Sequence, residues 1–146
     1  MNADEFSPYE TEGVLREYLL FHYGTEEETL SLGVGPREGL DFAVRSVAEL
    51  TERQTLPAAG ARALDVGCAV GRSSFELSRF CDEVTGLDFS GTFVKAADAL
   101  KREGELRYRH LAQGERSADA TARVPDEARP ENVTFLVGDA CDLPPG

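Results

Sequence analysis

The sequence predicts an α/β fold built on a parallel sheet, and three observations lead to this prediction. Short apolar runs at residues 62–66, 83–87 and 133–137 alternate with segments of helical spacing. A glycine-rich turn, residues 67–71, directly follows the first run, and acidic residues follow the others. Because the carboxyl ends of parallel strands meet at one edge of a sheet, we expect these turns to border one nucleoside pocket.

Composition limits the classes of function. The chain has 146 residues, which suits one domain, and a formal net charge of −12, which disfavours binding to nucleic acid. Its three cysteines form no CxxC pair, so we predict neither a disulfide framework nor a metal site. The start of the chain is polar, and no apolar run approaches the roughly 20 residues that span a bilayer. We therefore expect a cytoplasmic protein that acts on a small molecule, away from membranes.

The residue pattern of the N-terminal third of the sequence predicts helices rather than strands. Residues 1–10 are polar and predict a flexible N-terminus. Apolar residues at helical spacing predict a helix over 11–23, which Gly24 ends, and another over 37–53. We interpret residues 11–56 as a helical cap.

The pattern of residues 57–146 predicts alternating strands and helices, which we interpret as the N-terminal half of a Rossmann-like cofactor-binding domain. Weak alternation over 105–116 indicates a short hairpin arm with Gly114 near its turn. The polar stretch 117–132 predicts an irregular excursion. The regular elements expected, in order, are a strand over 62–66, a helix over 72–80, a strand over 83–87, a helix over 92–102 with Ser90 as its N-cap and Gly104 at its end, and a strand over 133–137.

Three strands make an incomplete sheet of this type. A doubly wound sheet places its first three strands in the order 3-2-1, and the fourth pairs on the far side of the first. No fourth strand is predicted, so strand 62–66 should lie at an open edge. An open edge invites pairing. We expect a partial fold whose edge is covered by a partner chain or by a second copy in a homo-oligomer.

The spacing of the glycine turn distinguishes between two classes of cofactor that the site could bind. The spacing Gly67-x-Ala69-x-Gly71, followed by Arg72, fits the dinucleotide pattern G-x-G-x-x-G poorly, and the Walker pattern is absent. The turn, preceded by Asp65, resembles motif I of the class I S-adenosylmethionine-dependent methyltransferases, with Ala69 in place of the middle glycine.

That resemblance implies a site for S-adenosyl-L-methionine. It implies that the turn passes under the methionyl part of the cofactor, that Asp88 binds the ribose hydroxyls and that Asp139 faces the adenine amine. Ionised carboxylates suit both tasks because they only accept hydrogen bonds. The candidate cofactor-binding residues are Asp65, Gly67, Cys68, Ala69, Gly71, Asp88, Phe89, Ser90, Asp139 and Ala140.

Four longer segments carry a more specific resemblance: Glu10-Thr11, Tyr18 to Gly24 (YLLFHYG), Gly67 to Leu77 (GCAVGRSSFEL) and Gly138 to Cys141 (GDAC). They resemble one branch of this superfamily, the methyltransferase part of ovothiol-biosynthesis enzymes. This resemblance implies methyl transfer to a ring nitrogen of mercaptohistidine, and it does not extend to the iron-dependent sulfur-inserting domain of that family.

Several alternatives stay open. Asp65 is expected either to touch the ligand or to cap the turn through backbone N–H groups. Cys68 is expected to be a buried thiol, and His22 a satisfied buried histidine. The alternative is that His22 or Tyr23 closes over the cofactor or acceptor, and Tyr9 and Tyr18 are similar candidates for a lid. No catalytic residue is assigned, because a neutral imidazole nitrogen, with an unperturbed pKa of about 6.5, needs no strong base to attack. A noncatalytic nucleoside-binding fragment and an NAD(P)-dependent oxidoreductase are the alternative functions.

Overall fold

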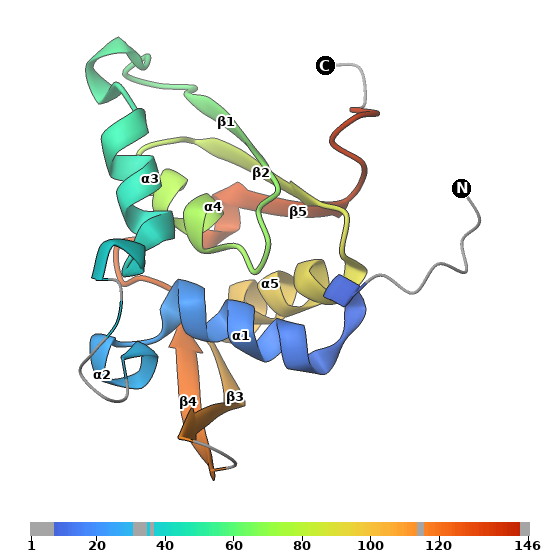
Figure 1. Ribbon diagram of the computed structural model, residues 1–146. Coiled ribbons are helices and arrows are strands. Elements are labelled where there is room, and N and C mark those ends of the chain that lie inside the picture. Colours follow the sequence, from blue (N-terminus) through green and yellow to red (C-terminus); the bar gives the residue numbers. More distant parts are fainter. Residues whose placement is uncertain (1–7, 31–34, 36, 114–115, 144–146) are drawn as a thin grey trace.

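The structure is a computed structural model that describes residues 8–30, 35, 37–113 and 116–143. It contains a parallel three-stranded sheet, helices packed on one face of that sheet, and a separate two-stranded hairpin (Figure 1). Residues 1–7 of the predicted flexible N-terminus and Gly114 of the predicted turn lie outside the described residues.

The parallel sheet has the predicted strand order. It consists of β1 (Arg62–Val66), β2 (Glu83–Asp88) and β5 (Val133–Val137), with β2 in the centre. The register aligns Ala63 with Val84, and Val84 with Val133. Strand β1 therefore lies at one edge, as the strand order 3-2-1 predicts, and all three strands end on the same side.

Two helices cover one face of this sheet. They are α4 (Arg72–Leu77), shorter than its predicted span, and α5 (Gly91–Glu103). Ser90 is the N-cap of α5, because its side chain accepts a hydrogen bond from the Phe93 amide, and Gly104 ends the helix. Both ends of α5 agree with the sequence prediction.

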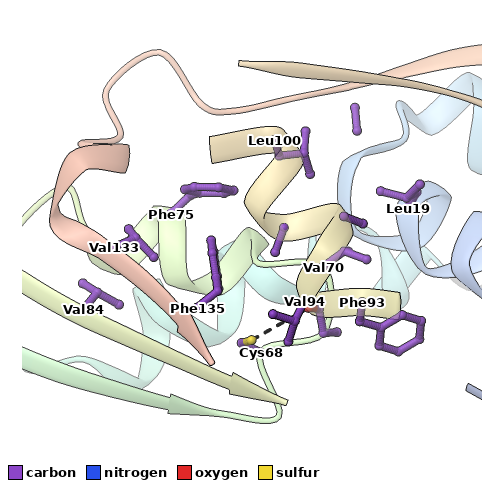
Figure 2. Packing of buried hydrophobic residues seen from close by; sticks show 14 of the residues in the cluster. Leu19, Cys68, Val70, Phe75, Val84, Phe93, Val94, Leu100, Val133 and Phe135 are labelled. Carbon is purple, nitrogen blue, oxygen red and sulfur yellow. Dashed lines mark hydrogen bonds between the residues drawn. The ribbon is translucent and has the colours of Figure 1, made fainter. Parts of the chain in front are cut away.

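The core lies between this face and the two helices and continues to Leu19 of the N-terminal helical region (Figure 2). Phe75 of α4 is fully buried and meets Phe135 of β5 edge to face, with ring centroids 5.5 Å apart. Val84 and Val133 are also fully buried beneath the helices. Among the described residues, Phe75 is the largest side chain that is fully buried.

The opposite face of the sheet is apolar and open among the described residues. Leu64, Val66 and Leu136 point to this face and are 53%, 45% and 42% exposed. Strands that are buried on both faces read as near-continuous apolar runs, and β5 comes nearest to this pattern, with Thr134 as its one polar residue. Here α4 and α5 cover one face only.

The N-terminal region is helical, with bounds that differ from those predicted. Helix α1 (Glu12–Tyr23) ends at Gly24, as predicted, and Thr11, predicted as its first residue, is its N-cap. The predicted helix over 37–53 is wrong in extent: Arg37–Gly39 form a 3-10 helix, and α3 spans Phe42–Leu50. Asp41 interrupts the two because its backbone is left-handed. The remaining short helices are η1 (Pro8–Glu10), α2 (Glu26–Thr29), η3 (Arg53–Thr55) and η4 (Pro130–Asn132).

The hairpin is longer than the sequence predicts. Strand β3 (Glu105–Gln113) pairs antiparallel with β4 (Arg116–Arg123), and both pack against α1. The predicted irregular excursion is therefore wrong for residues 117–123. His110 of β3 is buried. Ala120 and Ala122, two residues apart on β4, point to the same side of the hairpin and are buried.

No helix in the described part of the chain is long and apolar enough to cross a membrane. The same residues contain no group of three or more histidine, cysteine, aspartate or glutamate side chains placed to hold a metal ion.

Candidate functional site

The glycine turn after β1 is tied to the end of β2. The backbone N–H groups of Gly67 and Cys68 both donate to the Leu87 carbonyl, at 2.7 and 3.1 Å. At Gly71, which begins α4, the backbone is left-handed, and a Cβ atom would lie 2.7 Å from the Phe135 ring. Glycine at this position therefore lets the helix pack closely on β5. The turn thus holds a fixed position beside the carboxyl ends of the strands.

Asp88, at the end of β2, joins two loops through its carboxylate. One oxygen accepts from the Ala69 amide at 2.8 Å, and the other accepts from the Ser90 amide at 2.9 Å. Ala69 itself has a φ of 47°, in the left-handed region that a side chain disfavours. An ionised carboxylate has about four acceptor positions, so two remain for a ligand.

A pocket of about 430 Å³ opens at this point, within the range of roughly 300–1,000 Å³ that small-molecule sites span. Its walls come from the turn after β1, the end of β2, the start of α5, the segment after β5 and the N-terminal region. Among the predicted cofactor residues it brings together Gly67, Ala69, Asp88, Phe89, Ser90, Asp139 and Ala140.

The segment after β5 forms the wall opposite the turn. Gly138 donates to the Asp88 carbonyl at 2.9 Å, which keeps this segment against β2. One carboxylate oxygen of Asp139 accepts from the Cys141 amide at 2.8 Å, while the residue stays exposed at the pocket. Asp142, which could substitute for Asp139 by its place in the sequence, does not line the pocket.

Three predicted residues shape the turn without lining the pocket. Asp65 accepts hydroxyl hydrogen bonds from Ser73 and Ser74, both at 2.7 Å, rather than backbone N–H groups. Cys68 is fully buried, and burial raises the pKa of its thiol, which makes it a poor nucleophile. Gly71 is buried against Phe135. These residues position the turn.

Aromatic residues complete the pocket, and only part of this wall is visible in the sequence. Tyr9 and Tyr18 both line it, as does Phe93, which the sequence pattern places only in the core. The Tyr18 and Phe93 ring centroids are 4.5 Å apart, and Tyr9 meets each of them edge-on at 6.2–6.3 Å. The signal for Phe93 is its position three residues after the N-cap Ser90, which places it on the first turn of α5 beside the site.

Helix α1 also contacts the glycine turn. The Tyr23 hydroxyl donates to the Val70 carbonyl at 2.9 Å. His22 stacks on Tyr18, with ring centroids 5.9 Å apart, but its buried Nδ1 has no hydrogen-bond partner, so the expected satisfied histidine is wrong at this atom. Burial, helped by the nearby positive charge of Arg72 and opposed by Asp88, lowers the pKa of His22 to about 4.

A larger cavity of about 690 Å³ lies elsewhere, between α1 and the hairpin. It is lined by residues of α1, β3 and β4 and by none of the strand ends of the parallel sheet. In open α/β sheets ligands bind outside the carboxyl ends of the strands, so the smaller pocket is the candidate site.

A parallel sheet whose strands end on a glycine turn and two carboxylates defines a Rossmann-like fold of the class I methyltransferase type. The family model of the methyltransferase domain matches residues 64–145, and the chain belongs to this family. No curated protein sequence gives a significant match.

The chain is similar to solved structures, and one of them, with a TM-score above 0.5, has the same fold. The magnesium protoporphyrin IX methyltransferase from Synechocystis PCC 6803, solved with bound S-adenosylhomocysteine, is 23% identical with a TM-score of 0.54; the match covers 93% of this chain and 50% of that one. The phosphoethanolamine N-methyltransferase 1 of Haemonchus contortus is 17% identical with a TM-score of 0.42, over 95% of this chain and 24% of that one. This chain therefore spans half or less of the length of these two structures.

Proposed function

We propose that this chain is the cofactor-binding part of a methyltransferase and that its pocket binds S-adenosyl-L-methionine. The observation that carries the proposal is the convergence of the Gly67–Ala69 turn, Asp88 and Asp139 on one pocket at the carboxyl ends of three parallel strands. The membership in the methyltransferase domain family supports this choice over a nicotinamide cofactor.

Each wall of the pocket has a proposed part in holding the cofactor. Asp88 would accept hydrogen bonds from the ribose hydroxyls with the acceptor positions that Ala69 and Ser90 leave free. Asp139 would accept from the adenine amine, and Phe89 and Ala140 would flank the ring. The bound cofactor would supply an activated methyl group. The chain's residues would align it and exclude water.

For the acceptor we propose mercaptohistidine, methylated on a ring nitrogen in ovothiol biosynthesis. The support is the likeness of the Tyr18–Gly24, Gly67–Leu77 and Gly138–Cys141 segments to that family. Tyr18, Gly67 and Gly138 border the pocket, so all three of these segments meet at the site. The alternative function is that of a noncatalytic nucleoside-binding fragment.

We also propose that the protein works in the cytoplasm, where its three free cysteines stay reduced. The edge strand β1 presents unpaired backbone groups, and we propose that a second copy or a partner chain covers them. Light scattering of the purified protein would distinguish a monomer from a homo-oligomer.

Titration calorimetry tests the cofactor. We expect S-adenosylhomocysteine to bind and NADH to give no heat, and binding of NADH alone would contradict the proposal.

Replacing Asp88 with alanine should weaken the binding of S-adenosylhomocysteine by about 1.5–3 kcal/mol, because a charge-assisted hydrogen bond is lost. Glu83→Ala is the matched control, since Glu83 lies at the opposite end of β2 and pairs with Arg62 on the surface. An unchanged affinity of Asp88→Ala would remove Asp88 from the site.

Mass spectrometry tests the acceptor. The chain is incubated with S-adenosyl-L-methionine and mercaptohistidine, and a gain of one methyl group on the imidazole ring is the expected product. Binding of S-adenosylhomocysteine without any methylated product would favour the noncatalytic alternative.

A further inference from the structure

The segment Tyr9–Glu10 crosses the first turn of α5, although more than eighty residues separate the two in the sequence. The Thr92 amide donates to the Glu10 carboxylate at 3.1 Å, and the Thr92 hydroxyl donates to the same oxygen at 2.6 Å. The Ser90 hydroxyl donates to the Tyr9 carbonyl at 3.1 Å. Both residues of the segment are therefore fixed to the start of α5.

The position of Glu10 is electrostatically favourable. The first N–H groups of a helix have no partner within the helix, and the helix dipole attracts a negative charge there. Helix α5 is 13 residues long, and Glu10 supplies a carboxylate to one of these groups. The side-chain hydrogen bond from Thr92 is the main cause that lowers the pKa of Glu10, so this carboxylate is ionised at neutral pH.

Tyr9 is placed by this anchor rather than by burial. Its ring is 50% exposed, yet it lines the candidate pocket and meets both Tyr18 and Phe93 edge-on. A half-exposed ring with two edge contacts is weakly held by packing alone, since an aromatic pair contributes roughly 0.5–1.5 kcal/mol. The Glu10–Thr92 and Tyr9–Ser90 hydrogen bonds add the missing constraint.

We propose that Glu10 is a positioning residue that latches Tyr9 over the pocket and thereby slows the escape of a bound nucleoside cofactor. The inference rests on the proposed function, because it takes S-adenosyl-L-methionine or its product as the occupant. Glu10 acts through Tyr9 and α5 and does not line the pocket. Tyr9 itself forms part of the pocket wall.

Two readouts test the latch. The first is the hydrogen-exchange rate of the Thr92 amide in the free protein, measured by NMR, which Glu10→Ala should raise roughly tenfold because the amide loses its acceptor. The second is the dissociation rate of S-adenosylhomocysteine, measured by stopped-flow displacement, which the same variant should raise about fivefold or more. Glu10→Gln keeps one carbonyl oxygen as an acceptor and should give intermediate values for both rates.

Glu17→Ala is the matched control, because Glu17 is an exposed acid of α1 and should leave both rates unchanged. Faster dissociation in Glu10→Ala with a partial effect in Glu10→Gln would support the latch. Faster Thr92 exchange with unchanged dissociation would overturn the role in retention, and unchanged exchange would overturn the anchor itself. If the unmodified chain binds no S-adenosylhomocysteine, the proposed function fails and retention with it, while Thr92 exchange still decides whether Glu10 anchors the segment.

Discussion

Asp88 shows how one side chain can build a site before any ligand enters it. Its two oxygens hold the Ala69 and Ser90 amides, so the glycine turn and the start of α5 both depend on the same carboxylate. Ala69 has a left-handed backbone where the resembling motif carries glycine. The Asp88 hydrogen bond therefore helps to hold a turn that the Ala69 side chain strains.

His22 should make the stability of the protein fall at acidic pH. Its pKa is about 4 in the folded protein and about 6.5 in an unfolded chain, so the unfolded state binds more protons between these values. Stability that is present above pH 6.5 is therefore lost as the pH falls toward 4. Linkage puts the loss through His22 at about 2–3 kcal/mol between pH 7 and pH 4.5.

Urea unfolding at pH 7 and pH 4.5 measures this effect. The variant His22→Gln should lose less stability over this interval than the unmodified chain, and the difference isolates His22 from the carboxylates that titrate alongside it. Equal losses in the two proteins would show that His22 is protonated as easily in the folded state as in the unfolded one.

At the scale of elements, local signals predicted helix ends better than helix lengths. Ser90 and Gly104 bound α5 because an N-cap and a left-handed C-cap act on the nearest backbone groups. The predicted helix over 37–53 begins late because Asp41 adopts a left-handed backbone. Strand β4 was missed because its alternating alanines give a weak apolar signal, and its partner β3 supplies the hydrogen bonds.

Gly104 and Gly13 form a matched pair for testing whether local backbone conformation determines where a helix ends. Gly104 has a φ of 79° and Gly13 lies inside α1, and a Cβ atom at either position would meet nothing within 4 Å. Gly104→Ala should lower the free energy of unfolding by about 1 kcal/mol through backbone strain alone. Gly13→Ala should raise it by about 0.5–1 kcal/mol, because alanine favours the helix. Thermal or urea unfolding would contradict the assignment of Gly104 if both variants shifted stability in the same direction.

At the scale of the whole molecule, Arg129 connects the segment after the hairpin to the sheet. Its guanidinium donates to the Ser78 carbonyl at 2.7 Å and to the Cys81 carbonyl at 3.0 Å, and it pairs with Asp82 at 3.3 Å. These partners lie at the end of α4 and just before β2, about fifty residues earlier in the chain. The same contacts fix the path of the chain into β5.

Arg129→Ala should lower the free energy of unfolding by about 1–2 kcal/mol, a value reduced from that of a fully buried charged group because the side chain is partly exposed. Arg129→Lys should recover little of this loss, since an ammonium group does not reproduce the planar fork of donors. Arg123→Ala is the surface control, because Arg123 pairs with the exposed Glu105. Full stability of Arg129→Lys in urea unfolding would show that charge alone matters at this position.

The candidate site was predictable where its residues sit at strand ends. Asp88, Asp139 and the turn at Gly67 and Ala69 follow directly from apolar runs, and parallel strands bring such ends together without further information. Tyr9 and Phe93 were less visible as pocket residues, because their positions depend on where α1 and η1 pack against α5.

The sequence by itself determined the order of the parallel strands, the ends of α5 and the acidic edge of the sheet, because these depend on local spacing and on one topological rule. Only the tertiary structure decided that Asp65 accepts hydrogen bonds from Ser73 and Ser74 and that the Glu10 carboxylate accepts from Thr92. It also decided that the buried Nδ1 of His22 has no hydrogen-bond partner. Those contacts join residues of different elements, so they follow from packing, which a pattern read along one chain does not contain.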